Sequence, residues 1–256
     1  MAASPINNRK GGSPGGSTST RISNQDDHRG NLTGAPRTQA PQWDAVEKVC
    51  REAVPCRRCF EQNLVQAAHI DIAQPRWIGP QYFAASVRVL IVSLNPGAGN
   101  TPEKQRSNVP FRQVLHDYRD GRKTLRDLFE FQRQYIPRWG TPPGRFVRFY
   151  MDGLGLTLDE IALANIAWCA DARNKWPGPM LSQCFRFHTG NLVAAIRPDV
   201  AILSGSGTHR YAPEIGGLVP TCRVVCTMHY AHREGKDAER TELQRVRNEI
   251  ASARRR

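Results

Sequence analysis

The stretch Val87–Gly97, which reads VRVLIVSLNPG, decides the fold class of this chain. Its first eight residues are nearly all apolar, as in a strand that is covered on both faces of a parallel sheet. The Asn-Pro-Gly that follows predicts a sharp turn, which would hold the Asn95 amide at the tip of the strand. An amide takes up no proton at neutral pH, so Asn95 would orient a water or a substrate rather than act as a base. Capping of the turn is the simpler alternative for Asn95.

Three more short apolar runs predict further strands of the same kind. They are Ile161–Trp168, Val200–Leu203 and Arg223–Met228. Segments with the spacing of helices lie between or after these runs: Phe111–Tyr118, Leu125–Tyr135, Leu181–Ile196 and the amphipathic Glu239–Arg256. Strands that alternate with helices predict an α/β layered domain with right-handed crossovers.

The carboxyl ends of the predicted strands are the expected place for a functional site. They carry Asn95, Asn165, Gly205 and His229. His229 follows the fourth strand directly, in TMHYAHREG, and an imidazole there could donate a hydrogen bond to a substrate that gains negative charge. A structural role is the alternative for a lone histidine, so the functional interpretation requires that the strand ends meet.

Composition restricts the kind of protein further. The chain has 256 residues, with 36 basic and 23 acidic side chains and a formal net charge of +13, which favours a polyanionic partner. No run of about 18 apolar residues is present and no secretory signal is recognisable, so we expect no membrane association and a cytoplasmic protein, associated with the nucleoid if bacterial. The seven cysteines are then expected to be thiols or metal ligands rather than disulfides.

Residues 1–42 differ in composition from the rest of the chain. They contain two Gly-Gly pairs, four prolines and no aromatic residue, and too few large apolar side chains to offset the entropy of ordering. We predict a disordered basic arm for residues 1–42 and a folded domain for residues 43–256. The arm has two interpretations, a loose tether to phosphates or a solvated tail.

Four of the cysteines form two pairs with a spacing of interest. Cys56 and Cys59 are separated by two residues before the first predicted strand, and Cys169 and Cys184 bracket a Pro-containing loop after the second. If the fold brings the pairs together, four thiolates would suit a [4Fe–4S] cluster or, alternatively, Zn²⁺.

The motifs resemble, in their order, those of the uracil-DNA glycosylase superfamily over roughly Pro55 to Ala231. The similar segments are VLIVSLNPG, SNVPF (Ser107–Phe111), LANIAWC, RPDVAILSG and TMH. The Asn-Pro-Gly is similar to that of the mismatch-specific and single-strand-selective branches, whereas the four cysteines are similar to those of the iron–sulfur branches. The chain therefore mixes features of two branches, and it also departs from the superfamily at His229, where Tyr-Ala replaces the usual Pro-Ser.

This resemblance implies a three-layer α/β/α domain with a central four-stranded parallel sheet in the order 2-1-3-4. It implies a monofunctional DNA glycosylase of base excision repair, which hydrolyses the N-glycosidic bond of uracil or a related deaminated base. In that enzyme Asn95 would hold the attacking water and His229 would stabilise the departing base at O2. Asn165 would read the base edge, Phe111 would stack on the base, and Gly97 would contribute to substrate binding.

The resemblance also implies a wedge that fills the gap left by the everted base. Arg233 matches the wedge position of the single-strand-selective branch, and Tyr230 is the second candidate. The cluster of Cys56, Cys59, Cys169 and Cys184 would be structural, and the protein is expected to act on DNA as a monomer. Two alternatives stay open: a DNA-binding iron–sulfur protein that kept the fold without catalysis, and a zinc-stabilised α/β protein of unrelated function.

Overall fold

The computed structural model describes residues 40–62, 65–97, 99, 101–139, 144–173, 175–232 and 235–255. All of them belong to one unit that spans Ala35–Arg256. The predicted disordered arm lies outside the described residues, apart from its last three positions, which are helical. The first helix, α1 (Ala40–Ala53), therefore begins earlier than the predicted boundary at Trp43, because the turn before this tryptophan is part of the same helix.

A four-stranded parallel sheet forms the centre of the unit, as predicted. Its strands are β1 (Val89–Ser93), β2 (Ile161–Asn165), β3 (Val200–Ser204) and β4 (Arg223–Thr227). They lie in the order β2-β1-β3-β4, with Val89 in register with both Ile161 and Val200. Every residue of β2 and β3 is buried, which explains why these runs are continuously apolar instead of alternating.

Strand β2 is shorter than the predicted run Ile161–Trp168. It ends at Asn165, but the chain continues alongside β1, since the Ile166 amide donates to the Ser93 carbonyl (2.9 Å) and the Ala167 amide to the Leu94 carbonyl (2.9 Å). The apolar residues after Asn165 are buried although they lie outside the strand.

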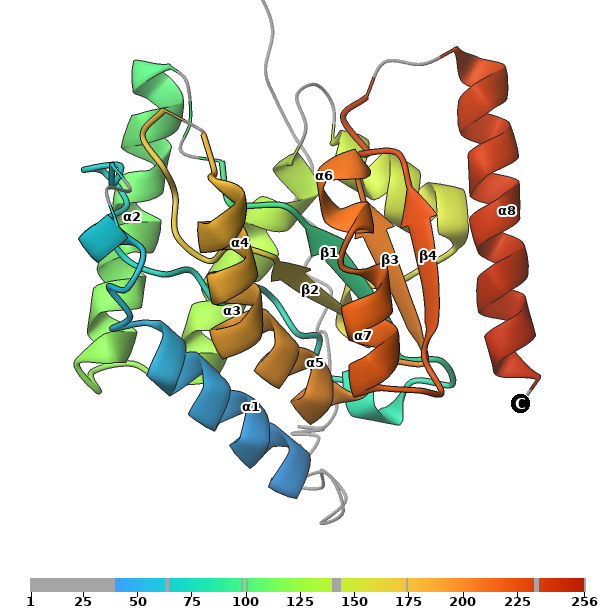
Figure 1. Cartoon of the computed structure of the whole chain (residues 1–256), viewed down its shortest axis with the longest axis horizontal. Helices are drawn as coiled ribbons and strands as arrows, with labels where there is room; N and C mark the ends of the chain where they lie inside the picture. Colours follow the sequence, from blue (N-terminus) through green and yellow to red (C-terminus); the bar gives the residue numbers. More distant parts are fainter. Residues whose placement is uncertain are drawn as a thin grey trace, which may run out of the picture. The chain divides into compact units, whose positions relative to one another are not determined.

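Helices cover the sheet on both faces and make the three-layer α/β/α arrangement that was predicted. The α-helices are α1, α2 (Pro102–Arg119), α3 (Leu125–Tyr135), α4 (Gly178–Cys184), α5 (Gly190–Ile196), α6 (Ser206–His209), α7 (Ala212–Leu218) and α8 (Lys236–Arg254). Short 3₁₀ or π turns are η2 (Phe60–Gln62), η3 (Tyr82–Ala84), η4 (Ile136–Arg138), η5 (Val147–Asp152), η6 (Leu158–Glu160) and η7 (Phe185–Thr189). Helices α4, α5 and α7 lie on one face with α1 packed against α5, while α8 lies beside β4 (Figure 1).

The predicted helices are found, with changes of extent; α8, for example, spans Lys236–Arg254 instead of Glu239–Arg256. Helix α2 begins at Pro102 rather than Phe111, because the Thr101 side chain caps it by accepting a hydrogen bond from the Lys104 amide (3.3 Å) and proline fits the first helical position. The predicted helix Leu181–Ile196 is a run of three helical pieces in which the π turn η7 joins α4 to α5. Among the described residues, no helix has both the length and the apolar character that crossing a bilayer requires.

A segment ahead of β1 pairs with the loop that follows β2. Gln66 and Asp171 form an isolated antiparallel bridge, flanked by hydrogen bonds from the Ala67 amide to the Ala170 carbonyl (3.3 Å) and from the Ala172 amide to the Val65 carbonyl (2.7 Å). This pairing fixes the loop after β2 against a part of the chain about a hundred residues earlier.

Candidate functional site

A cleft of about 800 Å³ lies at the carboxyl ends of β1 and β2. The structure brings together on this cleft every predicted residue of the active site that it describes: Asn95, Gly97, Phe111, Asn165, His229 and Tyr230. Asn95 follows β1, Asn165 is the last residue of β2, and His229 follows β4 by two residues. The predicted meeting of strand ends is therefore present.

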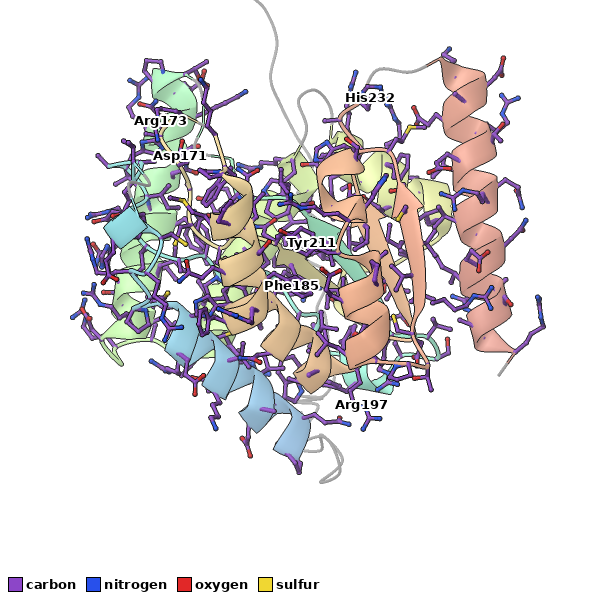
Figure 2. The ribbon with its side chains drawn as sticks, in the orientation of Figure 1. Asp171, Arg173, Phe185, Arg197, Tyr211 and His232 are labelled. Atoms are coloured by element: carbon purple, nitrogen blue, oxygen red, sulfur yellow. The ribbon has the colours of Figure 1, made fainter. Side chains whose placement is uncertain are left out.

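The lining of the cleft is cationic. Four of its described lining residues, Arg76, Lys104, Arg138 and Arg173, carry a positive charge, whereas no aspartate or glutamate is among them. Arg173 comes within 3.8 Å of the buried carboxylate of Asp171, which also accepts the backbone amide of Arg173 (2.8 Å). Figure 2 shows Asp171 and Arg173 side by side on the loop after β2. Such a lining attracts anions.

The His229 imidazole is held in one tautomer. Its Nδ1 accepts a hydrogen bond from the Ala231 amide (3.2 Å), so in the neutral ring the proton is on Nε2. Burial, together with the nearby His232, lowers the pKa of His229 and favours this neutral form. Arg145 Nη1 donates to the Ala231 carbonyl (2.9 Å) and so fixes the loop that orients the ring. His229 can therefore donate from Nε2 to a ligand in the cleft.

Gly205, at the end of β3, supports the position of His229. Its φ of 93° and ψ of 146° lie in a region that side-chain-bearing residues rarely adopt, and a Cβ there would lie 3.2 Å from the His229 Cβ. The Gly205 amide donates to the Thr227 carbonyl (2.8 Å), which ties this turn to the end of β4. A glycine is required where the end of β3 and the His229 side chain approach so closely.

Phe111 reaches the cleft from helix α2. Its ring stacks on Phe131 of α3 with centroids 5.8 Å apart and planes 5° apart, and Phe131 stacks in turn on Tyr135 (4.8 Å). Phe111 is only 9% exposed, so the stack holds its ring rigidly at the wall of the cleft. A planar ligand could pack against this wall.

The Asn165 side chain is committed to two neighbours. With Oδ1 turned to Arg76, it accepts a hydrogen bond from Arg76 Nε (2.9 Å), while Nδ2 donates to the Ala164 carbonyl (3.3 Å); the reverse orientation would leave both amide atoms without a partner. Asn165 is 5% exposed and therefore presents one fixed edge to the cleft. Asn165, which is predicted to read the base, therefore lies directly beside Arg76, a residue that the sequence analysis did not identify.

Of the two predicted wedge residues, the structure describes Tyr230 but not Arg233. Tyr230 lines the cleft, but its ring packs edge-on against Phe146 (5.5 Å) and Tyr150 (6.0 Å) rather than standing clear of the surface. The wedge role stays a prediction for both residues.

The four paired cysteines line a second, smaller cavity. Cys56, Cys59, Cys169 and Cys184 all border it, although no three His, Cys, Asp or Glu side chains within the described part of the chain are arranged to hold a metal ion. The hydrogen bond between the two thiols lowers the pKa of Cys59 and raises the pKa of Cys184. The Trp168 amide donates to Cys184 Sγ (3.3 Å) and opposes that rise.

The donor set around this cavity fits a thiolate-bound group. A backbone amide that donates to sulfur stabilises the thiolate form, and a hydrogen bond of this kind is a usual feature of iron–sulfur ligation. Burial raises the pKa of Cys169, so its proton would leave only in exchange for a cation. The pair Cys56 and Cys59 comes before β1 in the sequence and the pair Cys169 and Cys184 comes after it, and the fold brings both pairs to the same cavity.

Comparison with the models of known protein families finds no match, and comparison with curated proteins finds none either. The geometry of the cleft and the motifs of the sequence are therefore what bears on the function.

Several residues of the cleft carry no motif in the sequence. Gln74, Arg76, Gln132 and Trp139 all line it, and the Nε2 of Gln74 and Oε1 of Gln132 are buried without a hydrogen-bond partner among the described residues. A polar residue between prolines and aromatics, as Arg76 is in QPRW, is the only available signal, and it is a weak one.

Proposed function

We propose that this protein is a monofunctional DNA glycosylase that removes uracil or a related deaminated base from DNA. The observation that carries the proposal is the shared cleft, in which Asn95, Asn165 and His229 meet from three different strand ends. The sequence resemblance to uracil-DNA glycosylases assigns roles to the same three residues. The proposal therefore joins a pattern of motifs to a cavity in which those motifs converge.

The charge of the cleft supports DNA as the substrate. Lys104, Arg138 and Arg173 are exposed lining residues and would contact phosphates, and no carboxylate lines the described cleft to repel them. A base in a stacked strand cannot reach buried groups, so the enzyme must evert the nucleotide at a cost of a few kcal/mol. Stacking on the wall formed by Phe111 returns about 1–3 kcal/mol of that cost.

Hydrolysis requires stabilisation of both fragments. The bond between the sugar C1′ and the base breaks with its electron pair on the base, while water adds its oxygen to C1′ and releases a proton to solvent. The neutral His229 donates its Nε2 proton in a hydrogen bond to the base carbonyl O2, where negative charge develops. Asn95 orients the water, and the DNA phosphates offset the positive charge on the sugar.

No covalent intermediate is needed in this reaction, so we propose that the protein does not cleave the DNA strand. Lys104 makes this claim testable, because it is a lysine on the lining of the cleft. A glycosylase that used Lys104 as a nucleophile would nick the strand without alkali.

For the four cysteines we propose a [4Fe–4S] cluster, with Zn²⁺ as the alternative. Such a group, when bound, would join the segment before β1 to the segments after β2 and take no part in bond breaking. Cys56, Cys59, Cys169 and Cys184 would be its ligands.

The test is excision from single- and double-stranded oligonucleotides that carry one uracil, hypoxanthine or xanthine, followed by alkali and gel separation. We expect alkali-dependent cleavage at uracil, lost in Asn95→Ala and His229→Ala but retained in Asn248→Ala, a matched change on the exposed side of α8. Wild-type rates in both cleft variants would overturn the assigned roles. Binding to these oligonucleotides without excision of any base would favour the non-catalytic alternative.

A further inference from the structure

Arg76 places a guanidinium on the lining of the cleft, close to the predicted base-reading residue. Its Nε donates to Asn165 Oδ1 (2.9 Å), and its Cζ lies 5.2 Å from the Trp139 ring centroid and 6.0 Å from that of Phe111. Phe111 is the residue on which a base would stack. The terminal N–H groups of Arg76 are therefore next to the space that an everted base would occupy.

The charge of Arg76 has no counterion. Within the described residues, no carboxylate lies within ion-pair distance of it, and Asn165 Oδ1 is its only hydrogen-bond acceptor. Four of the five N–H donors of this arginine therefore have no acceptor among the described residues. Burial lowers the pKa of Arg76 to about 10, so the side chain still carries its charge at neutral pH.

A partly buried cation without a counterion is costly for a protein that gains nothing from it. Two neighbouring groups of the same cleft also lack a partner among the described residues, the donor Nε2 of Gln74 and the acceptor Oε1 of Gln132. The cost is offset if a ligand supplies acceptors. The ligand that fits is a planar ring with exocyclic carbonyl oxygens, and best of all one that becomes negatively charged.

We propose that Arg76 selects the base by donating from its terminal N–H groups to an exocyclic carbonyl, and that the same contact stabilises the departing base. The inference rests on the proposed function and names the group that distinguishes its substrates. Uracil, hypoxanthine and xanthine carry a carbonyl oxygen where cytosine and adenine carry an amino group. An amino group of cytosine or adenine would face the N–H groups of Arg76 with its own N–H groups, so the donors on both sides would lack an acceptor.

The contact strengthens as the reaction proceeds. When the bond to C1′ breaks, its electron pair remains on the base and spreads over the ring nitrogen and the carbonyl oxygens. The Arg76 cation then faces an anion instead of a neutral carbonyl, while water supplies the oxygen added to C1′ and the released proton goes to solvent. An interaction that is stronger in the transition state than in the ground state accelerates the reaction.

The first experiment measures binding without chemistry. Oligonucleotides that carry 2′-fluoro-2′-deoxyuridine or 2′-fluoro-2′-deoxycytidine resist hydrolysis, and their dissociation constants are compared for wild type, Arg76→Met, Arg76→Lys and Arg240→Met. Arg240 is an exposed arginine on α8, so its variant is the matched control for loss of one charge. We expect wild type and Arg240→Met to prefer uracil by about 10- to 100-fold, and both Arg76 variants to lose most of that preference.

The second experiment measures single-turnover excision of uracil and of 5-fluorouracil, whose anion is more stable. Arg76→Met is expected to slow uracil excision by about 100- to 1,000-fold, the usual effect of losing one donor to a developing anion. The loss for 5-fluorouracil is expected to be clearly smaller, because that base needs less help to leave. A merely structural role for Arg76 would slow both substrates equally.

The two experiments distinguish this inference from the proposed function. Uracil excision by wild type with unchanged base preference and rate in the Arg76 variants would overturn the inference and leave the function standing. Absence of excision by wild type, together with an Arg76-dependent preference for uracil in binding, would overturn the function and support base selection. Thermal unfolding of each variant checks the fold, and if Arg76→Met does not fold, wild-type base preference in Arg76→Lys overturns the inference by itself, because lysine lacks the forked donors.

Discussion

Gly205→Ala tests the packing that positions His229. The backbone of Gly205 is in a region almost restricted to glycine, which costs another residue about 1–3 kcal/mol, and the added Cβ would press on the His229 Cβ from 3.2 Å. We therefore expect the free energy of unfolding to fall by about 2–3 kcal/mol. For a domain of this size, that loss corresponds to a melting temperature lower by roughly 5–10 °C.

The matched control is Gly216→Ala. Gly216 lies within helix α7, and a Cβ added there meets nothing within 4 Å. Alanine is a better helix former than glycine, so this variant is expected to gain about 0.5–1 kcal/mol. Differential scanning calorimetry of wild type and both variants gives the comparison directly.

Gly205→Ala should also lower the rate of the proposed reaction by more than its loss of stability explains. At a temperature where Gly205→Ala is fully folded, excision of uracil is expected to be slower by about tenfold or more, because the imidazole would be displaced from its ligand. A melting temperature equal to that of wild type would refute the backbone argument. Full activity in a destabilised Gly205→Ala protein would refute the idea that this glycine positions His229.

Three further predictions concern pH, salt and metal. The fold favours the neutral form of His229, so the contribution of His229 to stability is complete above the unfolded pKa near 6.5 and is lost as the pH falls toward the lowered pKa. The free energy of unfolding, measured with urea, should therefore fall from pH 7.5 to 5.5 by more in wild type than in His229→Gln. Arg138→Gln should reduce the slope of log affinity for DNA against log salt by about 0.7–0.9, and Arg240→Gln should leave it unchanged. Anaerobically purified protein should contain about four iron and four sulfide per chain, lost in Cys184→Ser but kept in Cys226→Ser, whereas stoichiometric zinc in wild type would contradict the cluster.

The sheet was predictable because burial on both faces leaves a direct trace in the sequence. Runs such as Val200–Leu203 are apolar without interruption, and the structure places every residue of β3 in the core. The start of α2 was missed, since the prediction followed apolar spacing from Phe111, whereas the helix begins with polar residues behind a Thr101 cap. Capping is a local signal that apolar spacing does not contain.

The candidate site was predictable only in part. Asn95 and His229 come just after apolar strands and Asn165 ends one, so their convergence could be inferred from the rule for carboxyl ends of parallel strands. Arg76 and Gln132 reach the same cleft from segments without a strand or a motif, and their place depends on tertiary packing of distant parts of the chain. The sequence therefore predicts the strand-end groups and misses those that approach from the side.

The antiparallel bridge between Gln66 and Asp171 has a consequence for shortened versions of the protein. A fragment that started at the first strand would still contain Asn95, Asn165 and His229. It would lack Arg76, and Ala67 and Val65 would no longer hold the backbone of Ala170 and Ala172. The loop that carries Arg173 toward the cleft would lose its anchor, and Cys56 and Cys59 would be gone as well. If the proposed activity is present, the smallest active fragment is for this reason expected to begin well upstream of the sheet, so trimming from the amino end should abolish activity abruptly rather than by degrees.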